Sequence, residues 1–205
     1  MFWYEEDVKN LERIKESISY QPELVFYGSS SIRLWRSLNT DFANYHPINL
    51  GFGGSTLAAC VWYFDRIMAG LQPKGMVLYA GDNDLGDGRH PEEVFVYFKQ
   101  LMANIRQKYS NIPIAYISIK PSIRRFNIID QIKFTNKIIS DEIERMNDAT
   151  YFVNIYDSML DDNKYPRRDL FEPEGLHIND KGYALWKSII DETLAAKSLH
   201  LLSTI

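Results

Sequence analysis

The strongest constraint on the fold is the alternation of short apolar runs with segments that carry apolar residues at helical spacing. The short runs lack a clear alternation of polar and apolar side chains, which is typical of strands buried on both faces. They cover residues 24–27, 46–50, 76–80, 114–119 and 151–155. Strands that alternate with helices predict a parallel sheet with helices on both faces.

The segments between the runs predict helices at 4–18, 32–38, 57–68, 91–105, 128–146 and from 180 onward. This alternation of five strands with helices predicts a three-layer, flavodoxin-like sandwich with a five-stranded parallel sheet in the order 2-1-3-4-5. Ligands bind such sheets at the carboxyl ends of the strands, near the switch between strands 1 and 3. The polar stretch 157–173 is too charged for core and is expected to be loop. Without a repeat or linker, we expect one domain over residues 1–205.

Composition excludes several classes of function. The net charge is −4 and there is no dense Lys/Arg run, so nucleic acid or an anionic membrane surface is not expected as the main partner. The lone cysteine, Cys60, rules out an internal disulfide and a multi-Cys metal site, and its place on an apolar helix face predicts an inert core thiol. No signal peptide and no membrane-spanning run is visible, so a cytoplasmic location is expected.

Three consecutive serines follow the first apolar run, directly after Gly28. A strand that ends in such a turn and leads into a helix places a serine hydroxyl at the open edge of the sheet. The backbone N–H of Ser30 is then free at the positive end of the helix dipole. This suits a nucleophile that must generate an oxyanion beside itself. The alternative is that the serines only cap the helix.

Two further polar segments follow neighbouring strands. Gly54 offers an N–H that a ligand can approach closely, because glycine has no Cβ, and Asn83 offers an amide donor. Together with the Ser30 N–H they would form an oxyanion hole. The base is expected to be His177, which precedes the last helix, in preference to the other histidines. Those are His46, His90 and His200.

From about residue 24 to 186 the sequence resembles the SGNH (GDSL-type) hydrolases. The family's Gly-Asp-Ser block is matched by Gly28-Ser29-Ser30, its second block by residues 49–56, its Gly-x-Asn-Asp block by residues 81–84, and its Asp-x-x-His block by residues 174–177. The resemblance implies that Ser30 is the nucleophile, that Gly54 and Asn83 complete the oxyanion hole and that His177 is the base. There are two departures from the family pattern. Ser29 replaces an aspartate outside the triad, and Glu174 replaces the aspartate that orients the histidine.

The resemblance implies acyl transfer without metal or cofactor, and we expect a serine esterase acting on short acyl esters. The substrate would be a small-molecule ester. A lysophospholipase or thioesterase with a longer acyl channel is the first alternative, and a non-catalytic binding domain on the same fold is the second. Glu174 is either the triad acid or a solvated loop residue, in which case Glu172 or a backbone carbonyl holds His177.

Other patterns are weaker. Gly51-x-Gly53 hints at a dinucleotide fingerprint, but Thr56 stands where its third small residue belongs. The acidic residues Asp82, Asp84, Asp87 and Glu93 hint at a calcium loop that lacks its required glycine. Arg124 and Arg125 could contact an anionic substrate, but a solvated pair of loop charges is the expectation. Some aromatic side chains could line a pocket, although core packing is the default expectation. They are Trp35, Tyr63 and Phe126.

Overall fold

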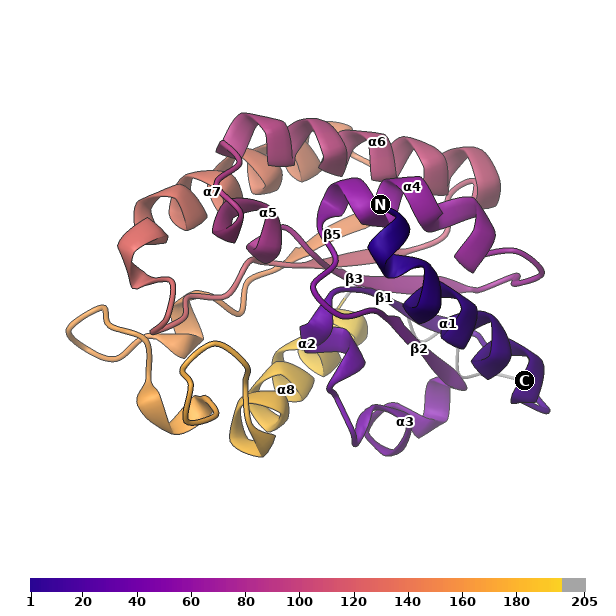
Figure 1. Ribbon diagram of the computed structural model, residues 1–205, viewed down its shortest axis with the longest axis horizontal. Helices are drawn as coiled ribbons and strands as arrows, with labels where there is room; N and C mark the ends of the chain where they lie inside the picture. Colours follow the sequence, from indigo (N-terminus) through magenta and orange to yellow (C-terminus); the bar gives the residue numbers. More distant parts are fainter. Residues whose placement is uncertain (197–205) are drawn as a thin grey trace.

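The computed structural model describes residues 1–196 and contains the predicted five-stranded parallel sheet (Figure 1). The strands are β1 (Leu24–Gly28), β2 (Pro47–Gly51), β3 (Gly75–Tyr79), β4 (Ile114–Ile117) and β5 (Thr150–Val153). Their order is β2-β1-β3-β4-β5, which confirms the flavodoxin-like prediction. Gly28 pairs with Gly51 on one side and with Tyr79 on the other, so β1, β2 and β3 all end at one edge of the sheet.

Helices cover both faces of the sheet (Figure 1). One face carries α1 (Glu5–Ser17), α4 (Leu57–Ile67), α6 (Pro91–Tyr109) and α7 (Ile129–Met146). The other carries α2 (Ser30–Arg33), α3 (Leu38–Asp41) and α8 (Asp180–Ala196). Side chains of β1 alternate between these layers, because Val25 and Tyr27 join the first core cluster and Leu24 and Phe26 the second.

Local sequence explains where the longer helices begin. Thr56 caps α4, and its hydroxyl accepts a hydrogen bond from the Ala59 N–H at 3.1 Å. Pro91 occupies the first turn of α6, and the Glu93 carboxylate accepts from the His90 N–H at 2.8 Å in a capping box. These caps fix the directions in which the helices leave the sheet edge.

The structure corrects three predictions between the strands. The helix expected at 32–38 is two single turns, α2 and α3, separated where the Trp35 indole N–H donates to Asp41 at 2.7 Å. The polar segment after β3, where no helix was predicted, forms the short helix α5 (Asp82–Gly86). The stretch 157–173 contains 3₁₀ turns at Asp157–Met159 and Arg168–Leu170 and contributes buried Met159 and Leu170 to the core beside α8. Its charges lie on the outside, so isolated apolar residues in a polar segment can still be core.

The remaining short 3₁₀ turns are Phe2–Tyr4, Ala43–Tyr45 and Phe126–Ile128. None of the helices in the described part of the chain combines the length and apolar character that crossing a bilayer demands.

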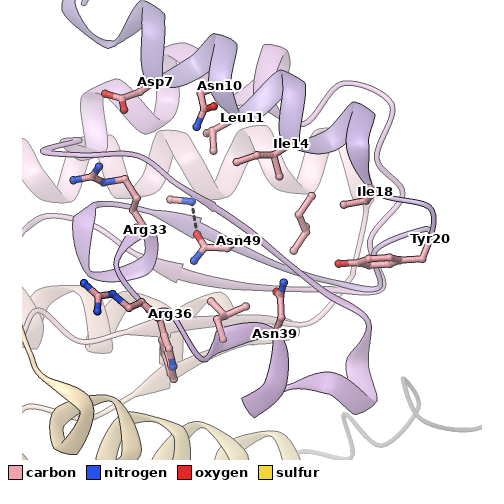
Figure 2. Close-up of a pocket in the computed structure, with 14 residues that line it drawn as sticks. Asp7, Asn10, Leu11, Ile14, Ile18, Tyr20, Arg33, Arg36, Asn39 and Asn49 are labelled. Carbon is pink, nitrogen blue, oxygen red and sulfur yellow. Dashed lines mark hydrogen bonds between the residues drawn. The ribbon is translucent and has the colours of Figure 1, made fainter.

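The outer edge of β2 is occupied by side chains from the same chain. The Tyr20 hydroxyl donates to the carbonyl of Pro47 at 2.5 Å, at the start of the strand. At its end the Gly51 N–H donates to the side-chain oxygen of Asn49 at 3.0 Å, the bond drawn dashed in Figure 2. The Asn49 amide in turn donates to the Ile32 carbonyl at 2.7 Å, which ties β2 to α2.

Candidate active site

Ser30 lies at the first turn after β1. Gly28 has φ +143°, and a Cβ at this position would lie 1.9 Å from the carbonyl oxygen of Tyr79, so only glycine lets β1 end this close to β3. Ser29 is extended and donates its N–H to that carbonyl at 2.9 Å. Ser29 and Ser31 are each 2% exposed, whereas Ser30 is only half-buried. Of the three serines, Ser30 alone presents its side chain toward solvent.

The helix that starts at Ser30 is shorter than the sequence pattern predicts. Since α2 has only four residues, it adds little macrodipole to the site. The turn is closed by the Leu34 N–H, which donates to the Ser30 carbonyl at 2.8 Å. Among residues 1–196 neither the N–H nor the hydroxyl of Ser30 has a hydrogen-bond partner. The N–H is therefore available as a local donor, without help from a long helix.

Gly54 lies in the turn between β2 and α4, before the cap residue Thr56 and not at the helix start itself. Its φ is +67°, which favours glycine, and a Cβ built there would meet nothing within 4 Å. The space beside Gly54 is therefore open. The Gly54 carbonyl accepts from the Tyr4 hydroxyl at 2.9 Å, so the N-terminal segment holds this turn in place.

Asn83 joins the turn that carries Gly54 to the start of α5. Its amide donates to the Ser55 carbonyl at 3.0 Å. The neighbouring Asp84 is fully buried and accepts from the Leu57 N–H at 2.7 Å and from Arg89 at 2.8 Å. Burial raises the pKa of Asp84 above its ordinary value. These bonds tie the segments that follow β2 and β3 to each other.

Asp82, at the start of α5, lies in a buried ionic cluster. Its carboxylate pairs with Lys120, which is 1% exposed, and with Arg125 at 2.5 Å. Burial alone would raise the pKa of Asp82, but the two cations outweigh it and hold the pKa below the ordinary value. Arg125 also donates to the side-chain oxygen of Asn83 at 3.0 Å. The prediction that Arg125 is solvated is wrong, because it faces an acid that the sequence pattern had not paired with it.

His177 is held by Glu174 in the loop before α8. The ring Nδ1 lies 2.8 Å from Glu174 Oε1, and the backbone N–H of His177 donates to the same oxygen at 3.1 Å. Burial acts to raise the pKa of Glu174, but hydrogen bonds from the backbone and from His177 outweigh it and lower the pKa. Both side chains remain about one-third exposed, at 34% for His177 and 38% for Glu174.

Helix α8 connects the His177 loop to the segment that carries Ser30. The Tyr183 hydroxyl donates to the Ser31 carbonyl at 3.0 Å, although the two residues lie far apart in the sequence. Tyr183 and Trp186 pack in the same core cluster as Ile32 and Trp35. The base of the loop is fixed as well, because the Glu172 N–H donates to the His177 carbonyl at 2.9 Å.

The acidic residues considered for calcium have other partners. Asp82 faces Lys120 and Arg125, and Asp84 faces Arg89 and a backbone N–H, so their charges are already compensated. Glu93 belongs to the capping box of α6.

The other candidates have different places in the fold. Trp35 and Tyr63 are core residues, while Phe126 is 37% exposed and packs on Tyr165. His46 precedes β2 and His90 caps α6. His200 lies outside the described residues. Cys60 is fully buried, and burial raises its thiol pKa, as expected for an inert core thiol.

A pocket of about 350 Å³ lies along the outer edge of β2, between α1 and the α2–α3 segment (Figure 2). Leu11, Ile14 and Ile48 contribute apolar side chains to its wall, and Asn10 and Asn39 contribute amides. Its lining includes none of Ser30, Gly54, Asn83 and His177. This pocket is therefore separate from the candidate catalytic and oxyanion-hole residues, although Trp35, one of the aromatic residues considered for a pocket, does line it.

Sequence reasoning missed the residues that fix the donors. These residues are Tyr4 in the 3₁₀ turn before α1, Asp84 in the Gly-x-Asn-Asp motif itself, and Arg125 in a distant loop. The structural role of Asp84 could have been predicted, because it stands next to the amide donor Asn83 in the motif and a buried acid requires a hydrogen-bond partner. The sequence carried no comparable signal for Tyr4 or Arg125.

Comparisons with solved structures find the same fold. A protein from Streptococcus pneumonia that is described as a platelet activating factor is 17% identical to this chain. The comparison covers 93% of this chain and 92% of that chain, with a TM-score of 0.83. A GDSL-like lipase from Bacteroides thetaiotaomicron is 21% identical, with 94% and 97% covered and a TM-score of 0.76. An acetyl esterase whose serine is replaced by alanine, solved with acetate ion, is 13% identical, with 88% and 97% covered and a TM-score of 0.69. At these identities the likeness shows the fold.

No curated protein matches the chain. The model of the GDSL-like lipase/acylhydrolase family matches residues 17–185, which include the serine turn, the turn of Gly54, the start of α5 and the His177 loop. The protein therefore belongs to the GDSL-like lipase/acylhydrolase family and is a carboxylic ester hydrolase.

Proposed function

We propose that this protein is a serine esterase that hydrolyses short-chain carboxylic esters, with Ser30 as nucleophile, His177 as base and Glu174 as the acid that orients the base. The observation that carries the proposal is the contact between His177 Nδ1 and Glu174 Oε1 at 2.8 Å. A carboxylate only accepts hydrogen bonds, so Nδ1 carries the proton and Nε2 is left free to accept one. This is the tautomer that a serine base requires.

The reaction proceeds by acyl transfer. His177 Nε2 takes the hydroxyl proton of Ser30 as the oxygen attacks the ester carbonyl, and Glu174 stabilises the imidazolium that forms. The imidazolium returns the proton to the leaving alcohol, which yields an acyl-enzyme. Water then attacks the acyl group with His177 again as base, and Ser30 recovers its proton. Ser30 and His177 share no hydrogen bond within residues 1–196, and the proposal requires that this bond forms when substrate binds, as catalytic hydrogen bonds often do.

Three donors are proposed to hold the oxyanion: the N–H groups of Ser30 and Gly54 and the side-chain amide of Asn83. An amide carries two N–H bonds, so Asn83 can keep its bond to the Ser55 carbonyl and donate the other to the oxyanion. The open space beside Gly54 allows a substrate carbonyl to approach. Removing one such donor typically costs about 10²–10³ in rate.

The preference for a short acyl group is supported by the brevity of the turns around the serine. Only Ser29 separates β1 from Ser30, and five residues separate β2 from α4. Among the structural neighbours, the acetyl esterase was solved with acetate, a two-carbon acid. Both points favour acetyl-like esters as substrates.

The proposal is tested by labelling with a serine-directed phosphonate and by hydrolysis of a chromogenic acetyl ester. Wild type should hydrolyse the ester and gain one phosphonate adduct, which peptide mapping should locate on Ser30. Ser30→Ala should lose both properties. An adduct on another serine, or a folded wild type that neither reacts with the phosphonate nor hydrolyses any ester in a chain-length panel, would overturn it.

A further inference from the structure

The guanidinium of Arg125 contacts two consecutive residues at the start of α5. Nη1 donates to the carboxylate of Asp82 at 2.5 Å, and Nη2 donates to the side-chain oxygen of Asn83 at 3.0 Å. Arg125 comes from the segment between β4 and α7, so these contacts cross from one strand's loop to another's. One planar guanidinium group therefore holds both side chains in a fixed relative position.

The contact with Asn83 determines which end of the amide faces which neighbour. The oxygen and nitrogen of an amide are nearly the same size, so only hydrogen bonding distinguishes the two orientations. Arginine has donors and no acceptor, so it must face Oδ1, while the Ser55 carbonyl must face Nδ2. With the amide turned over, Asn83 would present a carbonyl oxygen to a negative oxyanion.

The guanidinium is itself held in place. Asp82 is 4% exposed and is shared with buried Lys120, whose ammonium also contacts the hydroxyl of Tyr79 at 3.2 Å. On its other side Arg125 lies against Gly86, where a Cβ would come within 2.5 Å of guanidinium atoms. Any side chain at Gly86 would have to displace Arg125.

We propose that Arg125 is a positioning residue for the oxyanion donor: it fixes the amide of Asn83 with its N–H bonds toward the reacting carbonyl, and its positive charge polarises those bonds. The proposal rests on the proposed function, because it assigns Asn83 the role of donor. Arg125 itself contacts Asn83 and Asp82, and its effect on the reaction passes through the amide.

A double-mutant cycle tests this coupling. Arg125→Lys retains the charge but lacks the planar fork of N–H groups that spans Asp82 and Asn83, so kcat should fall by about 10–100-fold, less than the ~10²–10³ of a lost donor. KM for a neutral acetyl ester should change by less than about threefold, because the amide acts in the transition state. Asn83→Ala should show the full loss of a donor, and adding Arg125→Lys to it should cost nothing more.

Gly86→Ala perturbs Arg125 without removing it. The backbone φ of Gly86 is not in the left-handed region, and alanine favours helix more than glycine does, so the fold should tolerate the change. Because the added Cβ must push the guanidinium aside, kcat should fall with little change in melting temperature. Arg124→Gln is the matched control, since the exposed Arg124 side chain has no partner among residues 1–196 and the variant should keep wild-type kcat.

The outcomes separate this inference from the proposed function. The inference is wrong if Asn83→Ala costs the expected factor but the losses of Arg125→Lys add to it in the double variant. It is equally wrong if Arg125→Lys and Gly86→Ala keep normal kcat, whatever their melting temperatures. If Asn83→Ala itself has normal kcat, the assignment of Asn83 as donor fails first and this inference falls with it.

Discussion

Glu174 Oε1 accepts two hydrogen bonds from a single residue, His177: one from the ring Nδ1 at 2.8 Å and one from the backbone N–H at 3.1 Å. Glutamate is one methylene longer than the aspartate of the related motif. The extra length is accommodated within a tight turn, since only Gly175 and Leu176 separate the two residues and Oε1 still reaches both N–H groups of His177. The loop thus keeps a carboxylate in contact with Nδ1 of His177, although the acid is a glutamate and not an aspartate.

This contact predicts the effect of Glu174→Gln. The amide oxygen can still accept the Nδ1 proton, but it no longer stabilises the imidazolium, so kcat should fall by several hundredfold or more, toward the ~10⁴ of a triad Asp→Asn change. The melting temperature should change little, since the side chain is 38% exposed. Glu172→Gln is the control, because the exposed Glu172 side chain makes no hydrogen bond or ion pair within residues 1–196. A Glu174→Gln enzyme with near-normal kcat would remove Glu174 from the mechanism.

The serine turn predicts a different result for each of its three serines. Ser30→Ala should lose at least about 10³ in kcat, as removal of a triad nucleophile does. Ser29→Ala and Ser31→Ala should keep most activity, because both side chains are buried away from solvent. Steady-state kinetics and melting curves on the three variants decide the matter. If Ser31→Ala is the inactive variant, the assignment is off by one residue.

The buried pair of Asp82 and Lys120 predicts a strong effect on stability. Asp82→Asn leaves the ammonium buried without its carboxylate and should cost about 3–5 kcal/mol. Adding Lys120→Met removes the stranded ammonium and leaves only the less buried Arg125, so the double variant should regain most of that loss in urea unfolding. Equal or greater destabilisation of the double variant would show that the charges themselves are not what Asp82→Asn disrupts.

The same pair predicts how stability depends on pH. The pKa of Asp82 is lower in the folded state than its ordinary value of 3.8, because two cations favour the carboxylate. Its contribution to stability is therefore complete above about pH 4 and is lost as the pH falls through the folded pKa. Urea unfolding of wild type should show this loss below pH 4, and the Asp82→Asn/Lys120→Met variant should show a flatter profile. If wild type and the double variant lost stability in parallel as the pH falls, the loss could not be assigned to Asp82.

The short turns around Ser30 predict the substrate profile. With chromogenic esters of increasing acyl length, kcat/KM should be highest from acetyl to butyryl and should fall for longer chains. The Ser30→Ala variant run on the same panel measures the background. A maximum at eight carbons or longer would instead favour a lysophospholipase or thioesterase with a longer acyl channel.

The strands and their order could be predicted from the sequence because runs such as 24–27 are apolar on both faces, which leaves a parallel sheet with few arrangements. The split of the helix at 32–38 could not be predicted from the spacing of apolar residues, since Trp35, between the two turns, finds its partner Asp41 only in the folded chain. Arg125 was misjudged for a similar reason. A charge looks solvated until the fold brings its partner, Asp82, from another strand.

The side chains along β2 have a consequence for the molecule's solubility. An edge strand normally offers its backbone as a template on which another chain can add a strand. Here Pro47 has no N–H and its carbonyl is taken by Tyr20, while the Gly51 N–H is taken by Asn49. A strand arriving at this edge would find both ends of β2 already bonded, so the sheet is protected there against edge-to-edge aggregation by residues of its own chain.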